Sequence, residues 1–167
     1  MKISVALCTY NGEKYLSKQI DSLLKQTLPI DEIIILDDQS IDNTMTILKQ
    51  YGALYSSIVK VFQNEKRLGY IKNFEKALQH TTGDIIFLCD QDDRWYPEKT
   101  ERIVQYFKQN ENNWCVFHNL DLINEQDISL NKTIWDSISF TDDIQNQLLE
   151  NPANIFDYLL LGNRVTG

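Results

Sequence analysis

The chain has 167 residues, enough for one domain with a buried core. Hydrophobic residues make up 43% of it and charged residues 24%, which is typical of a soluble globular domain and excludes a disordered tail, a collagen-like repeat and a coiled coil. Twenty-four acidic and 16 basic residues give a net charge of −8. Because no cluster of Lys and Arg is present to bind a phosphate backbone, we expect no nucleic-acid partner.

The longest uninterrupted apolar run, Ile85–Cys89, has five residues. A membrane-spanning helix needs roughly 20, so we expect no transmembrane segment. The strand-like run that begins at Ile3 leaves no room for a basic-then-apolar leader. Cys8, Cys89 and Cys115 lack C-x-x-C spacing and lie in or beside apolar runs, which favours reduced, buried thiols. We therefore expect a cytoplasmic protein, with the inner face of the membrane as a further location.

Apolar runs alternate with helical periodicity through the first two-thirds of the chain. The expected strands, in chain order, are Lys2–Cys8, Glu32–Asp37, Ile58–Phe62, Asp84–Cys89 and Trp114–His118. Between them lie four amphipathic stripes at helical spacing, formed by Leu16, Ile20, Leu23 and Leu24, by Ile47, Leu48 and Tyr51, by Ile71, Phe74, Ala77 and Leu78, and by Ile103, Val104 and Phe107. The alternation predicts an α/β fold with a mostly parallel central sheet and helices on both faces.

Particular residues indicate where two of the predicted helices begin. Ser40 or Asp42 can cap the second helix, and Pro97 stands where a proline opens the fourth. Residues 119–167 lose the alternation, and only Ile155–Leu161 has a helical pattern there. We therefore treat residues 1–118 as the α/β domain and residues 119–167 as the start of a further portion of the same domain.

Polar side chains follow three of the expected strands. The segments are Cys8-Thr9-Tyr10-Asn11, Asp37-Asp38-Gln39-Ser40 and Asp90-Gln91-Asp92-Asp93. In open α/β sheets, ligands bind outside the carboxyl ends of the strands. An aromatic side chain and two acidic clusters should therefore share one edge of the sheet.

Each cluster has two interpretations. Three carboxylates within Asp90–Asp93 can bind Mg²⁺ or Mn²⁺, which often complete their shell with substrate phosphates, or they can form a turn and a helix cap. Asp37 and Asp38 can accept hydrogen bonds from a base or a ribose, or form an Asx turn. Tyr10 can bind a ligand or be a partly buried aromatic at a turn. No G-x-G-x-x-G, P-loop or G-x-S-x-G motif is present, so the sites that those motifs build are not expected.

Three segments together resemble the family 2 glycosyltransferases of the GT-A fold: Thr9–Leu16, Ile35–Thr44 and Asp90–Asp93. Asn73–Leu78, Thr82–Asp84 and Trp95–Lys99 are similar to the same family, particularly its bacterial rhamnosyltransferase-like members. The resemblance covers residues 2–110, and more loosely residues 162–167. It implies a Rossmann-like GT-A sandwich, with residues 1–118 as the nucleotide-sugar-binding domain and residues 119–167 as the truncated start of the acceptor side.

The resemblance implies inverting, metal-dependent transfer of a sugar from a UDP- or dTDP-linked donor to a saccharide or lipid-linked acceptor. Tyr10 would stack on the base, Asp38 would meet the base or ribose, and Asp92 would bind Mn²⁺ or Mg²⁺, with Asp90 as a second metal residue near the ribose. Lys72 and Asn73 match an Arg-Asn pair of the family, with Lys in place of Arg. The full set of nucleotide-binding residues that it implies is Thr9, Tyr10, Asn11, Glu13, Asp38, Lys72, Asn73, Asp90 and Gln91.

The catalytic base is expected beyond Gly167, because the family places an acidic residue after a Gly-containing segment that ends the chain here. An inverting transfer needs such a carboxylate to accept the proton of the attacking hydroxyl. Without the elements expected beyond Gly167, apolar surface on the sheet or on Ile155–Leu161 would be uncovered. Such surface would favour self-association. Two alternatives remain open: a receiver-like Mg²⁺-binding regulatory module, and a sugar nucleotidylyltransferase.

Overall fold

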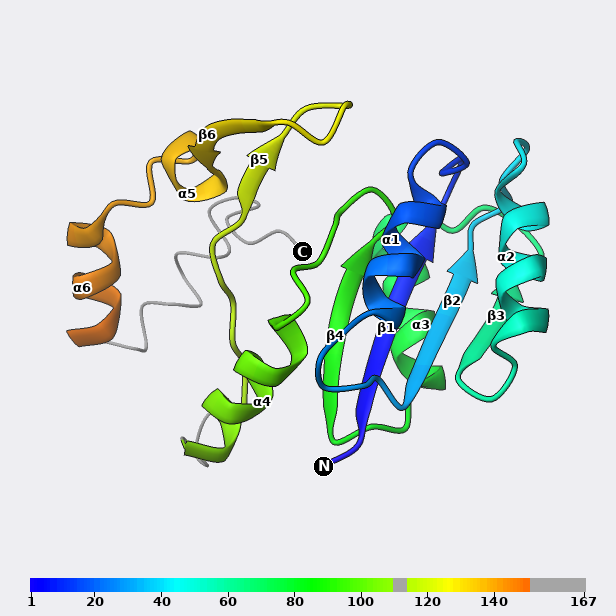
Figure 1. Cartoon of the computed structure of the whole chain (residues 1–167), viewed down its shortest axis with the longest axis horizontal. Helices are drawn as coiled ribbons and strands as arrows, with labels where there is room; N and C mark the ends of the chain where they lie inside the picture. The colour runs from blue at the N-terminus through cyan, green and yellow to red at the C-terminus, as the bar shows by residue number, and fades with distance from the viewer. Residues whose placement is uncertain (110–113, 151–167) are drawn as a thin grey trace. The chain divides into compact units, whose positions relative to one another are not determined.

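The computed structural model describes residues 1–109 and 114–150, and Figure 1 shows their helices and strands. The chain forms two compact units that divide near residue 112. The first unit contains the parallel sheet, and the described part of the second contains a short hairpin and two helices. Each unit has its own buried side chains, so each is described by itself.

Four parallel strands form the sheet of the first unit. They are β1 (Ile3–Thr9), β2 (Glu32–Asp37), β3 (Val59–Gln63) and β4 (Ile85–Asp90), in the spatial order β3-β2-β1-β4. The first four predicted strands are therefore confirmed, each within one residue or so of its predicted bounds. The strand order reverses between β1 and β4, which is where a doubly wound sheet opens a crevice for ligands.

Helices cover both faces of this sheet, as the sequence predicts. They are α1 (Leu16–Leu24), α2 (Thr44–Leu54), α3 (Tyr70–His80) and α4 (Lys99–Gln109). The larger core cluster joins the strands to α1, α2 and α4 through Leu16, Leu48 and Val104, whereas Phe74 and Ala77 of α3 pack on the other face. Figure 1 shows α1 and α2 in front of the sheet and α3 behind it.

The burial of the strands explains why the apolar runs in the sequence predict them correctly. Every residue of β1 and β2 is buried, so their runs are apolar on both faces. The edge strand β4 alternates instead, with Ile86 and Leu88 exposed to 42% and 47%. These two side chains are exposed because α3 packs on β1 and β2 rather than on β4. Ile71 and Leu78, predicted for the buried stripe of α3, are also exposed.

The predicted fifth strand is wrong. Trp114–His118 forms no strand, and within the described residues the parallel sheet ends at β4. Trp114 and Cys115 are exposed, so this apolar run has no buried position that would hold a strand. The exposure of Cys115 also corrects the expectation of three buried thiols, which holds for Cys8 and Cys89.

The predicted helix boundaries need smaller corrections. Pro97 lies in a turn two residues before α4 and does not open it. Asp42 accepts a hydrogen bond from the backbone N–H of Thr44 at 3.0 Å, as a capping residue does, although Asn43 is the residue before the helix. Ser40 hydrogen-bonds Asp37 instead. The helix predicted over residues 155–161 lies outside the described residues.

The second unit contains β5 (Asp121–Ile123), β6 (Ser129–Thr133), α5 (Ile134–Ser137) and α6 (Asp142–Glu150). The two strands are antiparallel, and Thr133 and Asp136 form a reciprocal cap at the start of α5. Phe140 is buried against Trp135, with ring centroids 4.9 Å apart. Across the described parts of both units, no helix has the length and apolar character that a membrane crossing requires.

Candidate functional site

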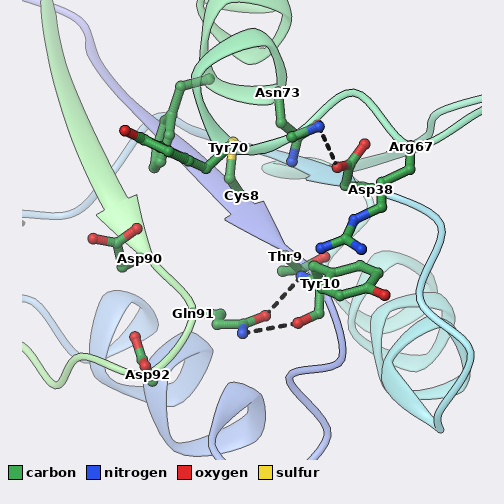
Figure 2. A pocket seen from close by; sticks show the side chains of 12 residues that line it. Cys8, Thr9, Tyr10, Asp38, Arg67, Tyr70, Asn73, Asp90, Gln91 and Asp92 are labelled. Atoms are coloured by element: carbon green, nitrogen blue, oxygen red, sulfur yellow. Dashed lines mark hydrogen bonds between the residues drawn. The ribbon is translucent and has the colours of Figure 1, made fainter.

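A cavity of about 510 Å³ lies at the carboxyl ends of the strands in the first unit (Figure 2). Its walls come from the loops after β1, β2 and β4, from the segment after β3 and from the first turns of α3. The lining residues are Cys8, Thr9, Tyr10, Asp38, Arg67, Gly69, Tyr70, Asn73, Phe74, Asp90, Gln91 and Asp92. The three polar strand ends that the sequence singles out therefore meet at one cavity.

Tyr10 and Arg67 form one side of this cavity. The guanidinium carbon of Arg67 lies 3.9 Å from the centroid of the Tyr10 ring, which is a favourable cation–π distance. Figure 2 shows both residues on the side of the cavity away from Asp90 and Asp92. An aromatic ring and a planar cation together suit a flat, polarisable ligand group such as a nucleobase.

Asp38 organises the segment that carries Arg67. Its carboxylate accepts hydrogen bonds from the backbone N–H groups of Leu68 and Gly69 at 2.7 and 2.8 Å, and from the side-chain amide of Asn64 at 2.9 Å. Burial works to raise the pKa of Asp38, but these hydrogen bonds and the charge of Arg67 lower it. Asp38 is therefore held as a carboxylate, and it fixes the backbone at Leu68 and Gly69 and the side chain of Asn64.

Asn73 completes the same network from α3. Its side-chain oxygen accepts a hydrogen bond from Asn64 at 2.7 Å, and its amide donates to the backbone oxygen of Leu36 at 2.9 Å. Gly69, directly before α3, has a positive φ of 81°, a conformation that glycine adopts without strain. The predicted residues Asp38 and Asn73 thus line the cavity and also build its wall.

The carboxylates of Asp90 and Asp92 form the opposite side of the cavity (Figure 2). Burial and the charge of Asp92 raise the pKa of Asp90. Burial, followed by the charge of Asp90, raises the pKa of Asp93 to about 6, against the opposing charge of Lys99. Burial and mutual repulsion thus disfavour the charged forms of Asp90 and Asp93, only partly offset by Lys99, and a bound cation would favour the charged carboxylates.

The donor set fits a cation that shares its shell with a ligand. Within residues 1–109 and 114–150, no three His, Cys, Asp or Glu side chains converge to hold a metal ion by themselves. Mg²⁺ and similar hard cations are usually bound by one or two carboxylates together with substrate phosphates. Asp90 and Asp92 provide that number of carboxylates on one wall of an open cavity.

Thr9 and Gln91 line the cavity with their polar atoms engaged by the protein. The Thr9 hydroxyl donates to Asp37 at 3.1 Å. The Gln91 amide donates to the backbone oxygen of Tyr10 at 3.0 Å and accepts from its backbone N–H at 2.8 Å. Asp37 also accepts from the backbone N–H of Ser40, three residues on, at 3.0 Å, one residue further than the bond that defines an Asx turn.

Three predicted nucleotide-binding residues do not line the cavity: Asn11, Glu13 and Lys72. Asn11 accepts a hydrogen bond from the backbone N–H of Ile41 at 2.9 Å. Glu13 accepts from the backbone and the side chain of Asn43, both at 2.8 Å. These contacts join the loop after β1 to the loop before α2. Lys72 is exposed on α3.

Arg67, Tyr70 and Phe74 line the cavity but are absent from the predicted site. Arg67 and Tyr70 lie after the third strand, whose carboxyl end reaches the same edge of the sheet, and this position is the signal that could have found them. The helical spacing predicts Phe74 for the buried stripe of its helix instead. The sequence pattern predicts a structural thiol at Cys8, and burial, with the charges of Asp90 and Asp38, raises its pKa to about 12.

The sequence model of one family, described as "Glycosyl transferase family 2", matches residues 4–165, nearly the whole chain. The chain belongs to glycosyl transferase family 2. An uncharacterized glycosyltransferase of Nostoc sp. is 33% identical over 151 residues, which cover 90% of this chain and 46% of the relative. A poly(ribitol-phosphate) beta-glucosyltransferase of Bacillus spizizenii is 34% identical over 113 residues, 66% of this chain and 18% of the relative. This family 2 chain thus spans half or less of the length of these relatives.

Solved structures show the GT-A fold that the sequence resemblance implies. TarS of S. aureus (residues 1–349), in complex with UDP, matches 66% of this chain and 33% of its own with a TM-score of 0.60 and 31% identity. A mannosyltransferase of Pyrobaculum calidifontis, in complex with GDP-Man and Mn²⁺, matches 75% of this chain and 36% of its own with a TM-score of 0.60. At 20% identity this second likeness shows the fold alone. The family assignment favours neither a receiver module nor a nucleotidylyltransferase.

Proposed function

We propose that this chain provides the donor site of an inverting glycosyltransferase that takes its sugar from a UDP- or dTDP-linked donor. The observation that carries the proposal is the single cavity in which Tyr10 with Arg67 faces Asp90 with Asp92. One wall suits a base and the other suits a cation and its phosphates. A nucleoside diphosphate has these two parts at its two ends.

The comparisons support the nucleotide and the class of product. TarS, at 31% identity, is described with UDP and with UDP-GlcNAc. Relatives include a poly(ribitol-phosphate) beta-glucosyltransferase and a protein named for teichuronic acid biosynthesis, 28% identical over 151 residues. We therefore propose a saccharide or lipid-linked acceptor and a role in polysaccharide biosynthesis.

The residues of this chain would divide the work of donor binding. The Tyr10 ring would stack on the base, and Asp38 would keep residues 64–69 in place beside it through Leu68 and Gly69. Asp90 and Asp92 would hold Mn²⁺ or Mg²⁺. The cation would neutralise the diphosphate leaving group as a Lewis acid.

Calorimetric titration of the chain with UDP, dTDP and GDP, with and without Mn²⁺, tests this proposal. We expect UDP or dTDP to bind, and to bind more tightly with Mn²⁺, because the cation links the diphosphate to Asp90 and Asp92. Asp92→Asn should abolish the effect of Mn²⁺. Asp93→Asn is the matched control, because Asp93 does not line the cavity, and it should keep that effect. Equal affinity with Mn²⁺ and with chelator in the wild-type chain would remove the metal role.

A further inference from the structure

Gln91 lies between two acidic cavity residues, but its side-chain amide bonds the protein backbone. Its amide oxygen accepts a hydrogen bond from the Tyr10 N–H at 2.8 Å, and its amide nitrogen donates to the Tyr10 carbonyl at 3.0 Å. The side chain therefore pairs with the backbone of Tyr10 as a neighbouring strand would. Figure 2 shows this pair of hydrogen bonds between the Asp90–Asp92 wall and the Tyr10 wall.

Gly12 provides an independent sign that this contact is built into the fold. A Cβ atom at Gly12 would lie 2.8 Å from the side-chain carbon Cδ of Gln91 and closer still to its amide oxygen. Real Cβ atoms essentially never approach so closely. Any larger residue at position 12 would therefore push the Gln91 amide away from Tyr10.

The backbone of Gly12 has little freedom to avoid that clash. Its N–H donates to the Thr44 hydroxyl at 2.8 Å, and its carbonyl accepts from the N–H groups of Tyr15 and Leu16, both at 3.0 Å. These bonds tie position 12 to the beginnings of α1 and α2. Since the φ of Gly12 is not in the left-handed region, the effect of a larger residue here would come from displacement of the Gln91 side chain rather than from backbone strain.

The geometry points to Gln91 as a positioning residue that sets Tyr10 relative to Asp90 and Asp92. This inference rests on the proposed function, in which one donor molecule contacts both walls at once. The loop after β1 carries the base-binding ring, and the loop after β4 carries the carboxylates. The two hydrogen bonds fix one loop against the other before the nucleotide arrives, which lowers the conformational entropy lost on binding.

A positioning role and direct nucleotide contact predict different double-variant results. If Gln91 acts through Tyr10, removal of the Tyr10 ring removes the benefit of holding it. If Gln91 touches the nucleotide itself, its loss adds to the loss of the ring. The non-additivity of the two changes therefore measures the coupling.

The experiment is a calorimetric titration of the full chain with UDP in the presence of Mn²⁺. Gln91→Ala should weaken UDP binding about tenfold, as expected for loss of two hydrogen bonds that preorganise the site. In a Tyr10→Ala background, Gln91→Ala should change the affinity less than about twofold. Gly12→Ala should weaken binding to a similar extent as Gln91→Ala and add nothing in the Gln91→Ala background. Gly52→Ala, a glycine substitution on α2, is the control and should bind UDP as the wild type does.

The unfolding temperature provides a readout that does not depend on nucleotide. Gly12→Ala should lower it, and addition of Gln91→Ala should recover part of the loss because the clash is gone. The positioning role would be overturned if the affinity losses of Gln91→Ala and Tyr10→Ala multiply, or if Gln91→Ala loses no affinity. In either case, UDP binding by the wild-type chain would still uphold the proposed function. A wild-type chain that binds no nucleoside diphosphate would overturn both.

Discussion

The wall that Tyr10 and Arg67 form shows how a few residues can prepare a site. Arg67 is held over the ring because Asp38 fixes the adjoining backbone through Leu68 and Gly69. The same carboxylate is near enough to Arg67 for the positive charge to lower its pKa. One buried acid thus fixes the backbone of a loop and partly balances the charge of the side chain that the loop presents.

Removal of the Tyr10 ring should weaken nucleotide binding without unfolding the sheet. Stacking of a base on an aromatic side chain is worth about 1–3 kcal/mol in nucleic-acid binders, so Tyr10→Ala should lower UDP affinity about tenfold or more. Tyr10→Phe keeps the ring and is the matched control. Calorimetry measures the affinities, and circular dichroism checks the fold. An Ala variant that binds UDP as tightly as the Phe variant would return Tyr10 to a structural role.

Sequence reasoning predicted the residues at the strand ends because strand ends are local. Asp90 follows an apolar run directly, Tyr10, Asp38, Gln91 and Asp92 come soon after the end of one, and all five line the cavity. The roles of their side chains are not local. The Gln91 amide is engaged by a backbone segment 81 residues away, and no pattern along the chain encodes that pairing.

Arg67 was missed for a related reason. It lies four residues beyond β3, in a segment whose path depends on contacts with the Asp38 carboxylate and the Asn64 side chain. Asn11 and Glu13 show the reverse case. They lie in the same loop after β1 as Tyr10, but their side chains bind the loop before α2. Proximity in sequence to a strand end does not tell which direction a loop side chain takes.

At the scale of whole elements, Glu32 connects several elements at the amino-terminal end of the sheet. It begins β2, is 2% exposed, and accepts hydrogen bonds from the Ser4 hydroxyl at 2.6 Å and from the Thr82 N–H and hydroxyl at 2.5 and 2.9 Å. Lys2 and Lys60 each place an ammonium 3.5 Å from it. The carboxylate thereby links β1, β2, β3 and the connection between α3 and β4.

This junction should make the fold sensitive to acid. Burial works to raise the pKa of Glu32, but the hydrogen bonds from Ser4 and Thr82 and the charge of Lys2 lower it to about 2, from 4.5. A carboxylate with a lowered pKa stabilises the fold above its unfolded value and loses that contribution as the pH falls from about 4.5 towards 2. The shift corresponds to about 3 kcal/mol of unfolding free energy.

Urea unfolding at pH 7 and at pH 3 measures this contribution. Glu32→Gln should destabilise the chain at pH 7 and should lose less stability between pH 7 and pH 3 than the wild type. Glu75→Gln changes an exposed carboxylate on α3 and should keep the wild-type acid dependence. If Glu32→Gln loses as much stability between pH 7 and pH 3 as the wild type does, other carboxylates account for the acid sensitivity.

The elements themselves were predictable where burial is complete. The runs of β1 and β2 are apolar because both of their faces are covered, and the period of α1 follows from one buried face. The failures lie where apolar residues are exposed. Trp114–His118 resembles a strand by composition, but Trp114 is exposed and the segment forms no strand.

At the scale of the whole chain, the residues of the cavity and the second unit are separate in sequence. Every lining residue lies between Cys8 and Asp92, within the first unit. The second unit has its own aromatic cluster, in which Phe140 lies 4.9 Å from Trp135 and 6.1 Å from Phe117 between ring centroids. We therefore predict that donor binding and the packing of the second unit can be changed independently.

Phe140→Ala tests this independence in the full chain. Phe140 is 6% exposed, so its truncation should destabilise the second unit by about 3 kcal/mol through the cavity that it leaves. Hydrogen exchange should become faster in residues 117–148 and stay unchanged in β1, β2 and β4, while UDP affinity stays within about twofold of the wild-type value. Phe87→Ala is the matched variant, because Phe87 is buried on β4 against Trp95. It should speed exchange in the sheet and weaken UDP binding, since β4 positions Asp90. A tenfold loss of affinity in Phe140→Ala would instead show that the second unit contributes to the donor site.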